Sequence, residues 1–314
     1  MMVVNMCVLF HNRGAKIMAI PYTSKKISST AGQNALCSRA LFVNLPANPL
    51  IHMIDIKRAG TVVLLLLSLA GRAQNGLNRN LVWSDEFNYK GLPDTSKWSF
   101  DVGGNGWGNK ELEFYTNRRL ENARVEDGKL VIEARKEQWE GMEYTSARLV
   151  TKGKGDWKYG RIEVSARLPK GTGTWPAVWM LGSVRPLKWP DDGEIDIMEH
   201  VGFHPGYIHG SVHCKKYNHV IHTQKTDTLY VNDCSENFHV YGLEWNADSI
   251  RVSVDDHVYF RFGNEHSGYS AWPFDNKMYL LLNIAVGGGW GGQKGVDERI
   301  WPQRMEIDYV RVYQ

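Results

Sequence analysis

The sequence predicts an all-β fold, a β-sandwich or barrel filled by one domain over residues 74–314. Short runs with alternating or wholly apolar character recur along this span, and turn signals separate them. Helical periodicity is scarce, and no linker interrupts the span, whose length suits one large β-domain. All 12 Trp lie from Trp83 onward, a richness in aromatics that is typical of β-proteins.

The expected strands follow from alternation and from β-branched and aromatic content. Turn signals at 126–128, 169–171, 246–248 and 255–256 bound several of them. The expected strands are residues 129–134, 160–168, 174–181, 193–200, 238–245, 249–254 and 305–313.

Composition excludes several classes of protein. The chain is 43% hydrophobic and 23% charged, which excludes a disordered, collagen-like or coiled-coil protein. Its net charge is only +3, whereas proteins that grip nucleic acid carry a strong positive excess. We therefore expect an uncharged substrate and no nucleic-acid partner.

Residues 57–73 have a basic start, an apolar run between Gly60 and Gly71, and small residues before Gln74. This pattern predicts a secretory signal peptide over 53–73, with the natural start at Met53. A transmembrane anchor would need about 20 apolar residues, so we expect no membrane attachment after cleavage and a secreted protein, extracellular or periplasmic. Residues 1–52 are interpreted as translated upstream sequence or a disordered segment.

Two cysteines, Cys214 and Cys234, remain in the expected exported domain. An oxidising compartment permits a disulfide between them. Two separately buried thiols explain the sequence equally well, because sequence alone does not show whether the two Cα atoms approach within about 7 Å.

Three carboxylates alternate with apolar residues in the expected strand 193–200. Glu194 and Asp196 share one face by the period of two, whereas Glu199 at an odd offset would point into the core. One extra residue at Ile197–Met198, a β-bulge, returns Glu199 to the face of the other two. Crowded carboxylates push their pKa values apart, which gives an acid and a nucleophile for retaining glycoside hydrolysis. The alternative is a solvated polar strand face.

Tryptophans accompany these acids. Trp175 and Trp179 share a strand face with the small Ala177 between them, and Trp290 lies in a glycine-dense loop where a backbone can approach a ligand closely. Indoles stack on the apolar faces of sugars, so the pattern indicates a glycan cleft. Core packing is the alternative for the first two, and ordinary loop packing for the third.

Four motifs in order resemble glycoside hydrolase family 16, in its laminarinase branch. The resemblance runs from about Leu81 to Tyr313 and implies a β-jelly-roll sandwich with a substrate cleft on its concave sheet. It also implies endo-acting, retaining cleavage of internal β-1,3 bonds in β-glucan polysaccharides such as laminarin. The motifs are GWGNKEL at 106–112, WPAVWM at 175–180, EIDIME at 194–199 and NIAVGGGWGG at 283–292.

The resemblance also implies roles for individual residues. Glu194 matches the nucleophile, Glu199 the acid/base and Asp196 an assisting residue that hydrogen-bonds the nucleophile. Asn109, Arg148 and His213 match substrate contacts. Each has a simpler alternative, respectively a turn former, a solvated strand charge and a hydrogen-bonded histidine behind the cleft.

No cofactor is implied for catalysis, and we expect a monomer. Many family members bind a structural calcium, and the matching positions are Glu86, Gly128 and Asp308. Oxygen ligands of this kind suit that ion.

Substrate alternatives stay open within the resemblance. A mixed-linkage β-1,3-1,4-glucan, agar or carrageenan could be the substrate. The chain could instead be a non-catalytic β-glucan-binding protein, although such relatives have lost the acids. Mixed-linkage-specific relatives usually lack the bulge residue, so Met198 favours the laminarinase interpretation.

Overall fold

The computed structural model describes residues 5–11, 14–20 and 79–314, and the chain forms two compact units, Met1–Gly76 and Leu77–Gln314. In the first unit, β1 (Asn5–His11) pairs antiparallel with β2 (Gly14–Ile20). This hairpin lies inside the segment expected to be upstream sequence or disordered. The other residues of 1–52 and the expected signal peptide at 53–73 lie outside the described residues, so both expectations stay predictions.

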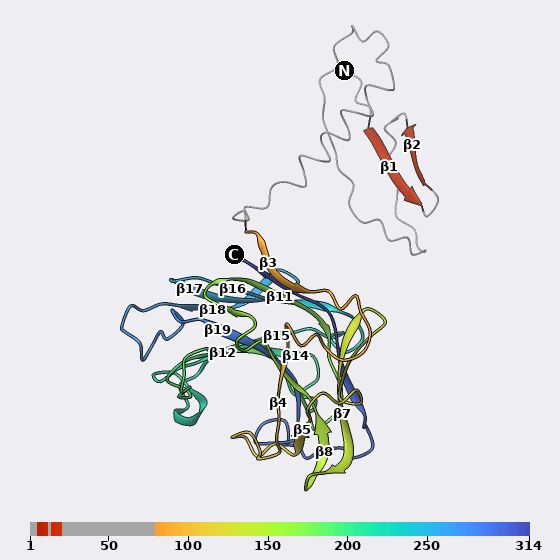
Figure 1. Cartoon of the computed structure of the whole chain (residues 1–314). Coiled ribbons are helices and arrows are strands. Elements are labelled where there is room, and N and C mark those ends of the chain that lie inside the picture. The colour runs from red at the N-terminus through yellow and green to blue at the C-terminus, as the bar shows by residue number, and fades with distance from the viewer. Residues whose placement is uncertain (1–4, 12–13, 21–78) are drawn as a thin grey trace. The chain divides into compact units, whose positions relative to one another are not determined.

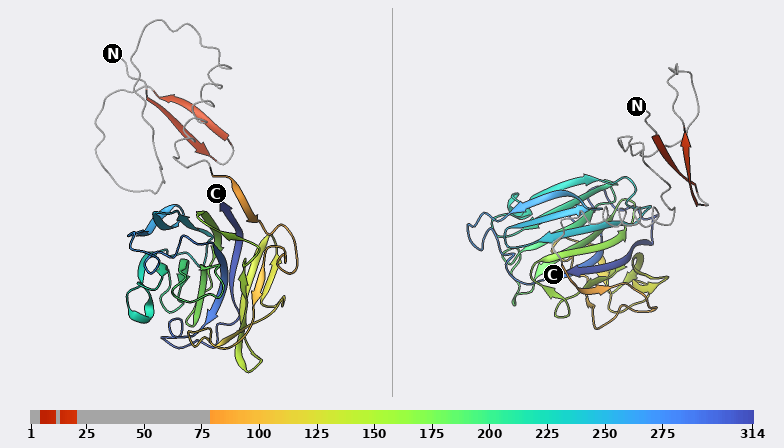
Figure 2. Two further views of the ribbon diagram at one scale, coloured as in Figure 1. Left: turned by 60° about the vertical axis from the view of Figure 1, so that its left-hand side comes forward. Right: turned by 90° about the horizontal axis from the view of Figure 1, so that it is seen from above.

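Two β-sheets build the second unit (Figures 1 and 2). One has eight strands in the order β15-β14-β13-β12-β19-β9-β4, with β10 paired to β19; we call it the cleft sheet. The other has ten strands in the order β18-β17-β16-β11-β20-β7-β8-β5, with β3 paired to β20 and β6 to β7; we call it the back sheet.

The cleft sheet consists of β4 (Ser99–Asp101), β9 (Arg148–Val150), β10 (Asp156–Trp157), β12 (Thr174–Gly182), β13 (Glu194–His200), β14 (Tyr207–His213), β15 (Lys225–Tyr230) and β19 (Met278–Val286). The back sheet consists of β3 (Leu81–Asp85), β5 (Glu113–Tyr115), β6 (Ala123–Glu126), β7 (Lys129–Trp139), β8 (Met142–Ser146), β11 (Gly160–Arg167), β16 (His239–Trp245), β17 (Ser249–Val254), β18 (His257–Gly263) and β20 (Gln303–Tyr313). All seven strands expected from the sequence are present.

The hydrophobic core lies between the sheets. Alternate residues of β11, such as Ile162 and Val164, pack into one buried cluster with Ile195 of β13 and Leu282 of β19. Every residue of β19 is buried, and on its other face Tyr279 and Leu281 form a second small cluster with Leu181. The all-β prediction is confirmed. Apolar residues alternate along the strands because one side of each strand faces the core between the two sheets, as in a two-layer sandwich.

Two of the expected turns close tight hairpins. Asp127 and Gly128 between β6 and β7 have φ of 51° and 72°, and Asp255 and Asp256 between β17 and β18 have φ of 49° and 65°. Two consecutive left-handed residues are the signature of the type I′ turn, which Asp and Gly tolerate best. These turns fix the register of the back sheet.

Within the described part of the chain, the single helix is the 3₁₀ turn η1 (His219–Ile221), capped by the Asn218 side chain. No helix among the described residues has the length and apolar character needed to cross a bilayer. Cys214 and Cys234 are buried free thiols, so of the two alternatives for this pair the structure shows separate thiols.

Candidate active site

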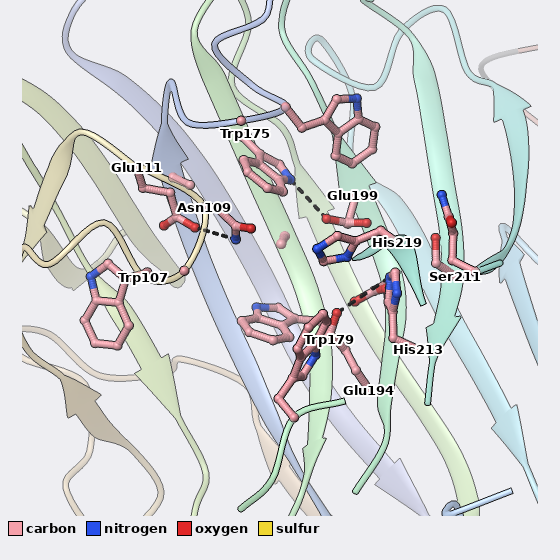
Figure 3. A pocket seen from close by; sticks show the side chains of 18 of the residues that line it. Trp107, Asn109, Glu111, Trp175, Trp179, Glu194, Glu199, Ser211, His213 and His219 are labelled. Carbon is pink, nitrogen blue, oxygen red and sulfur yellow. Dashed lines mark hydrogen bonds and ion pairs between the residues drawn. The ribbon is translucent and has the colours of Figure 1, made fainter. Parts of the chain in front are cut away.

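A cleft of about 1070 Å³ opens on the face of the cleft sheet that points away from the core. Side chains from β12, β13, β14 and β19 form its floor, and loops around Asn109, Trp189, His219 and Trp290 form its walls. Figure 3 shows the lining side chains converging from these separate segments. Every catalytic and substrate-binding residue predicted from the sequence lines this cleft.

The predicted β-bulge places the acids. On β12, Val178 is opposite Met198 while Trp179 is opposite Asp196, so Ile197 is left without a partner. The pairing of β13 with β14 shifts in the same interval. Ile197 and Met198 both bury their side chains, and Glu194, Asp196 and Glu199 all face the cleft. The bulge prediction is confirmed.

Each outer glutamate accepts a hydrogen bond from an indole. Trp175 Nε1 donates to Glu199 Oε1 at 3.0 Å, and Trp189 Nε1 donates to Glu194 Oε2 at 2.8 Å. Figure 3 shows the first of these bonds beside the cleft. A donor to a carboxylate favours its ionised form, so each indole both orients its acid and opposes its neutralisation.

Burial raises the pKa of Glu194, and the charge of Asp196 raises it further, while His213 and the Trp189 bond act in the opposite direction. Burial also raises the pKa of Glu199 well above the usual value, again with a contribution from Asp196. Raised carboxyl pKa values in a cleft are typical of acid catalysts.

Asp196 pairs with His213 rather than with the nucleophile. His213 Nε2 lies 3.3 Å from Asp196 Oδ2 and 3.8 Å from Glu194 Oε1. Burial disfavours the imidazolium, but the Asp196 and Glu194 carboxylates outweigh it and raise the pKa of His213 to about 9. Asp196 therefore influences Glu194 through its charge, and the expected hydrogen bond between them is replaced by this ion pair.

The wall beyond Glu199 is aromatic. The Trp290 ring lies 5.5 Å from the Trp175 ring and 4.9 Å from the His209 ring, both edge to face. Glycines allow this packing, because a Cβ on Gly291 would lie 2.6 Å from Gly287 O and 2.9 Å from Trp175 Cβ. The sequence predicted that the backbone of this loop approaches a ligand closely. In the structure, the loop backbone makes its close approach to other residues of the protein.

Arg148 lies between two indoles. Its guanidinium carbon is 4.7 Å from the ring centroids of both Trp107 and Trp179, and its Nε is 3.1 Å from Asp101 Oδ2. Arg148 is only 9% exposed to solvent. It is therefore not the solvated strand charge of the simpler interpretation, and it braces the two indoles.

Several further cleft residues were not singled out from the sequence, among them Trp107, Glu111, Trp189 and His219. Trp189 and His219 come from different loops, yet their rings lie 5.0 Å apart near Glu194. Trp107 and Glu111 lie within the motif 106–112, so the motif could have indicated both as cleft residues. For Trp189 the sequence offers only a weaker indication, which is a tryptophan five residues before the first acid.

The positions expected to bind calcium lie close together by register, since Asp85 pairs with Val310 and Leu130 with Ile307. Their side chains do not form a carboxylate cage. Arg311 donates to both oxygens of Glu86, at 2.9 and 2.7 Å, and Asp308 is exposed. Gly128 offers only backbone. A calcium site here would depend on backbone carbonyls and stays a prediction.

Among the described residues, Glu194, Asp196 and His213 are the single set whose potential metal-ligating atoms lie within 4.8 Å of one another. The ion pair of a protonated His213 with the carboxylates accounts for this cluster without a metal.

Comparisons with known proteins agree with this geometry. The model of the glycosyl hydrolases family 16 matches residues 110–311. A model described as beta-glucan synthesis-associated protein SKN1/KRE6/Sbg1 matches residues 6–187, a span that ends before the acidic strand.

Two curated relatives and one solved structure show the same likeness. A beta-glucanase of Rhodothermus marinus is 54% identical over 262 residues, which are 80% of this chain and 92% of the relative. A glucan endo-1,3-beta-glucosidase of Cryptopygus antarcticus is 40% identical over 250 residues, 74% of this chain and 90% of the relative. The X-ray structure of the laminarinase from Rhodothermus marinus is 56% identical, with a TM-score of 0.74, and the match covers 76% of this chain and 98% of that one.

Proposed function

The chain belongs to glycosyl hydrolase family 16, and from this premise we propose that it is an endo-β-1,3-glucanase that cleaves laminarin-like glucans with retention of configuration. The observation that carries the proposal is the bulged strand β13, which presents Glu194, Asp196 and Glu199 together in a tryptophan-lined cleft. The resemblance seen in the sequence is thereby confirmed, and the fold matches that of solved laminarinases.

Glu194 is the proposed nucleophile. One carboxylate oxygen attacks the anomeric carbon while Glu199 gives its proton to the glycosidic oxygen, and the leaving glucan departs as an alcohol. In the second step, Glu199, now ionised, takes a proton from water, and that water displaces Glu194 from the anomeric carbon. Two inversions restore the original configuration.

The different surroundings of the two glutamates support this assignment. Glu194 lies beside the His213 cation, which favours its ionised form, and the Trp189 bond adds to that preference. Glu199 has no cation within salt-bridge distance among the described residues, and burial holds its pKa well above the usual range. The acid that stays protonated is therefore Glu199, and the one that ionises more easily is Glu194.

The cleft lining supports an uncharged glucan. Lys110 and Arg148 are its two basic residues besides histidines, and Arg148 is already paired with Asp101. A sulfated polysaccharide such as carrageenan would require free cations to pair with its sulfates. Aromatic and amide side chains predominate instead, which suits stacking on sugar faces and hydrogen bonding to hydroxyls.

Release of reducing ends from laminarin, lichenan, agarose and carrageenan at equal mass tests the proposal. We expect laminarin to be cut fastest, with a mixture of oligosaccharides from the first minutes, because an open cleft binds internal bonds. Glu194→Gln serves as the control for contaminating activity. A preference for agarose or carrageenan would contradict the substrate, and early release of glucose alone would contradict endo action.

We also propose that the enzyme is exported through the signal pattern at residues 57–73. Mapping the N-terminus of protein isolated from its native culture tests this proposal. A mature end near Gln74 is expected, and exported protein that begins at Met1 would contradict it.

A further inference from the structure

We propose that Glu111 is a positioning residue that orients Asn109 and Trp179 for glucan binding through a buried hydrogen-bond relay. The inference rests on the proposed function and extends it from the acids to the side of the cleft on which Asn109 lies. Figure 3 shows Glu111, Asn109 and Trp107 on the opposite side of the cleft from Glu194, Glu199 and His213.

The relay runs through five residues. Trp179 Nε1 donates to Asn283 Oδ1 at 2.7 Å, and Asn283 Nδ2 donates to Tyr115 Oη at 3.0 Å. Tyr115 in turn donates to Glu111 Oε2 at 3.2 Å, while Asn109 Nδ2 donates to Glu111 Oε1 at 3.0 Å. These residues come from β12, β19, β5 and the loop before β5, so the relay joins segments distant in the chain.

Every hydrogen bond of the relay has a fixed direction, because both of its arms end on the Glu111 carboxylate, which only accepts. Both oxygens of its carboxylate are used, one by Asn109 and one by Tyr115. Asn109 must therefore turn its amide nitrogen toward Glu111. Its amide oxygen, which has no hydrogen bond from the described residues, is left to accept from a sugar hydroxyl.

Trp179 is fixed in the same way. Its single N–H is used by Asn283, so it offers a sugar its ring and no donor. Arg148 lies 4.7 Å from the same ring, which further limits its movement. A ring held in place before binding loses little conformational entropy when a pyranose stacks on it.

The relay residues themselves are largely hidden. Tyr115 is 0% exposed, Asn283 5% and Glu111 6%. Glu111 and Asn283 present little surface to the cleft, so we infer that their contribution to glucan binding passes mainly through Asn109 and Trp179, which are more exposed. This separation predicts that breaking the relay weakens binding and leaves the chemistry at Glu194 and Glu199 intact.

Tyr115→Phe is the sharpest test, because it removes one hydroxyl and breaks two bonds while the ring keeps its packing on Trp107, 5.3 Å away. For long laminari-oligosaccharides we expect KM to rise about tenfold, with kcat within twofold of the unmodified enzyme. Tyr241→Phe is the matched control. Tyr241 is also fully buried, its hydroxyl has no hydrogen-bond partner among the residues that the structure describes, and it does not line the cleft.

Oligosaccharide length separates positioning from general loosening of the fold. For the shortest cleavable oligosaccharide that does not reach Asn109, Tyr115→Phe should raise KM by less than for long substrates, because only the Trp179 arm of the relay then acts. A structural defect would affect every length equally. In an Asn109→Ala background, Tyr115→Phe should raise KM by less than threefold. Glu111→Gln, which keeps the shape but loses one acceptor, should reproduce the rise in KM.

The inference is overturned if Tyr115→Phe leaves KM unchanged for long substrates, lowers kcat equally at every length, or keeps its full effect without Asn109. An unmodified enzyme that does not cut laminari-oligosaccharides would instead contradict the proposed function. The two failures are therefore distinguishable in one set of kinetics.

Discussion

The indole N–H of Trp189 donates a 2.8 Å hydrogen bond to Glu194, the proposed nucleophile, from a loop five residues earlier in the chain. Burial and the charge of Asp196 raise the pKa of Glu194, and this bond is one of the contacts that lower it. A nucleophile must be ionised to attack. Trp189 therefore favours the reactive form of the acid that it orients.

Trp189→Phe keeps a ring in the wall and removes the N–H. Without the donor the pKa of Glu194 should rise, so its ionised fraction falls on the acidic side. We expect the acidic limb of the profile of kcat/KM against pH to move up by roughly 0.5–1 pH unit, since a hydrogen bond to an exposed donor is partly screened.

Trp139→Phe is the matched control, because Trp139 is 37% exposed against 39% for Trp189 and lies on β7 of the back sheet. Its profile should coincide with that of the unmodified enzyme. An acidic limb that stays in place in Trp189→Phe would show that this bond does not act on the nucleophile.

His213 supplies the cation of the site, and its charge should be visible in stability. Its pKa is about 9 in the folded protein and near the ordinary 6.5 when unfolded. A raised pKa adds stability that is fully present below about pH 6.5 and is lost as the pH rises through about 9.

His213→Asn should therefore lower the free energy of unfolding by about 3 kcal/mol at pH 6 and by much less at pH 10. Chemical denaturation at both pH values measures the difference. His257→Asn, which changes an exposed histidine of β18, should have little effect at either. An equal loss at both pH values from His213→Asn would mean that packing, and not charge, explains its contribution.

The free thiols give a separate prediction. Cys214 is 0% exposed and Cys234 2%, and burial raises the pKa of each thiol. An alkylating reagent should leave both unmodified in the folded protein and label both in denaturant, as read by peptide mass spectrometry. Recovery of a peptide pair joined through these two residues would contradict the structure.

The strands and the bulge could be predicted from the sequence because both follow from local rules. Alternation fixes which face each strand residue occupies, and the odd offset of Glu199 requires one extra residue at Ile197–Met198. The same reasoning placed Trp175 and Trp179 together on one strand face, and Glu194 and Asp196 together on a face of another strand. These features depend only on which side chains are buried over a few consecutive residues.

The contacts that join distant segments were not predictable in this way. Trp189 lies in an irregular loop, where no periodicity indicates the direction of a side chain, and its bond to Glu194 depends on how the loop folds back. Glu111 lies in a sequence motif, but the relay that connects it through Tyr115 of β5 to Asn283 of β19 forms only in the assembled sheets. The ion pair of Glu86 with Arg311 spans 225 residues, so no local pattern in the sequence indicates that this carboxylate has a cation as its partner.

The assignment of Glu194 as nucleophile and Glu199 as acid/base is tested most directly by the configuration of azide products. Glu199→Ala keeps the nucleophile, so an activated aryl β-glycoside, which needs little protonation, should still form the glycosyl-enzyme. Azide should then release a β-glycosyl azide after two inversions. Glu194→Ala should give the α-glycosyl azide by direct attack. An exchange of these two products, identified by proton NMR, would reverse the two roles and contradict the account.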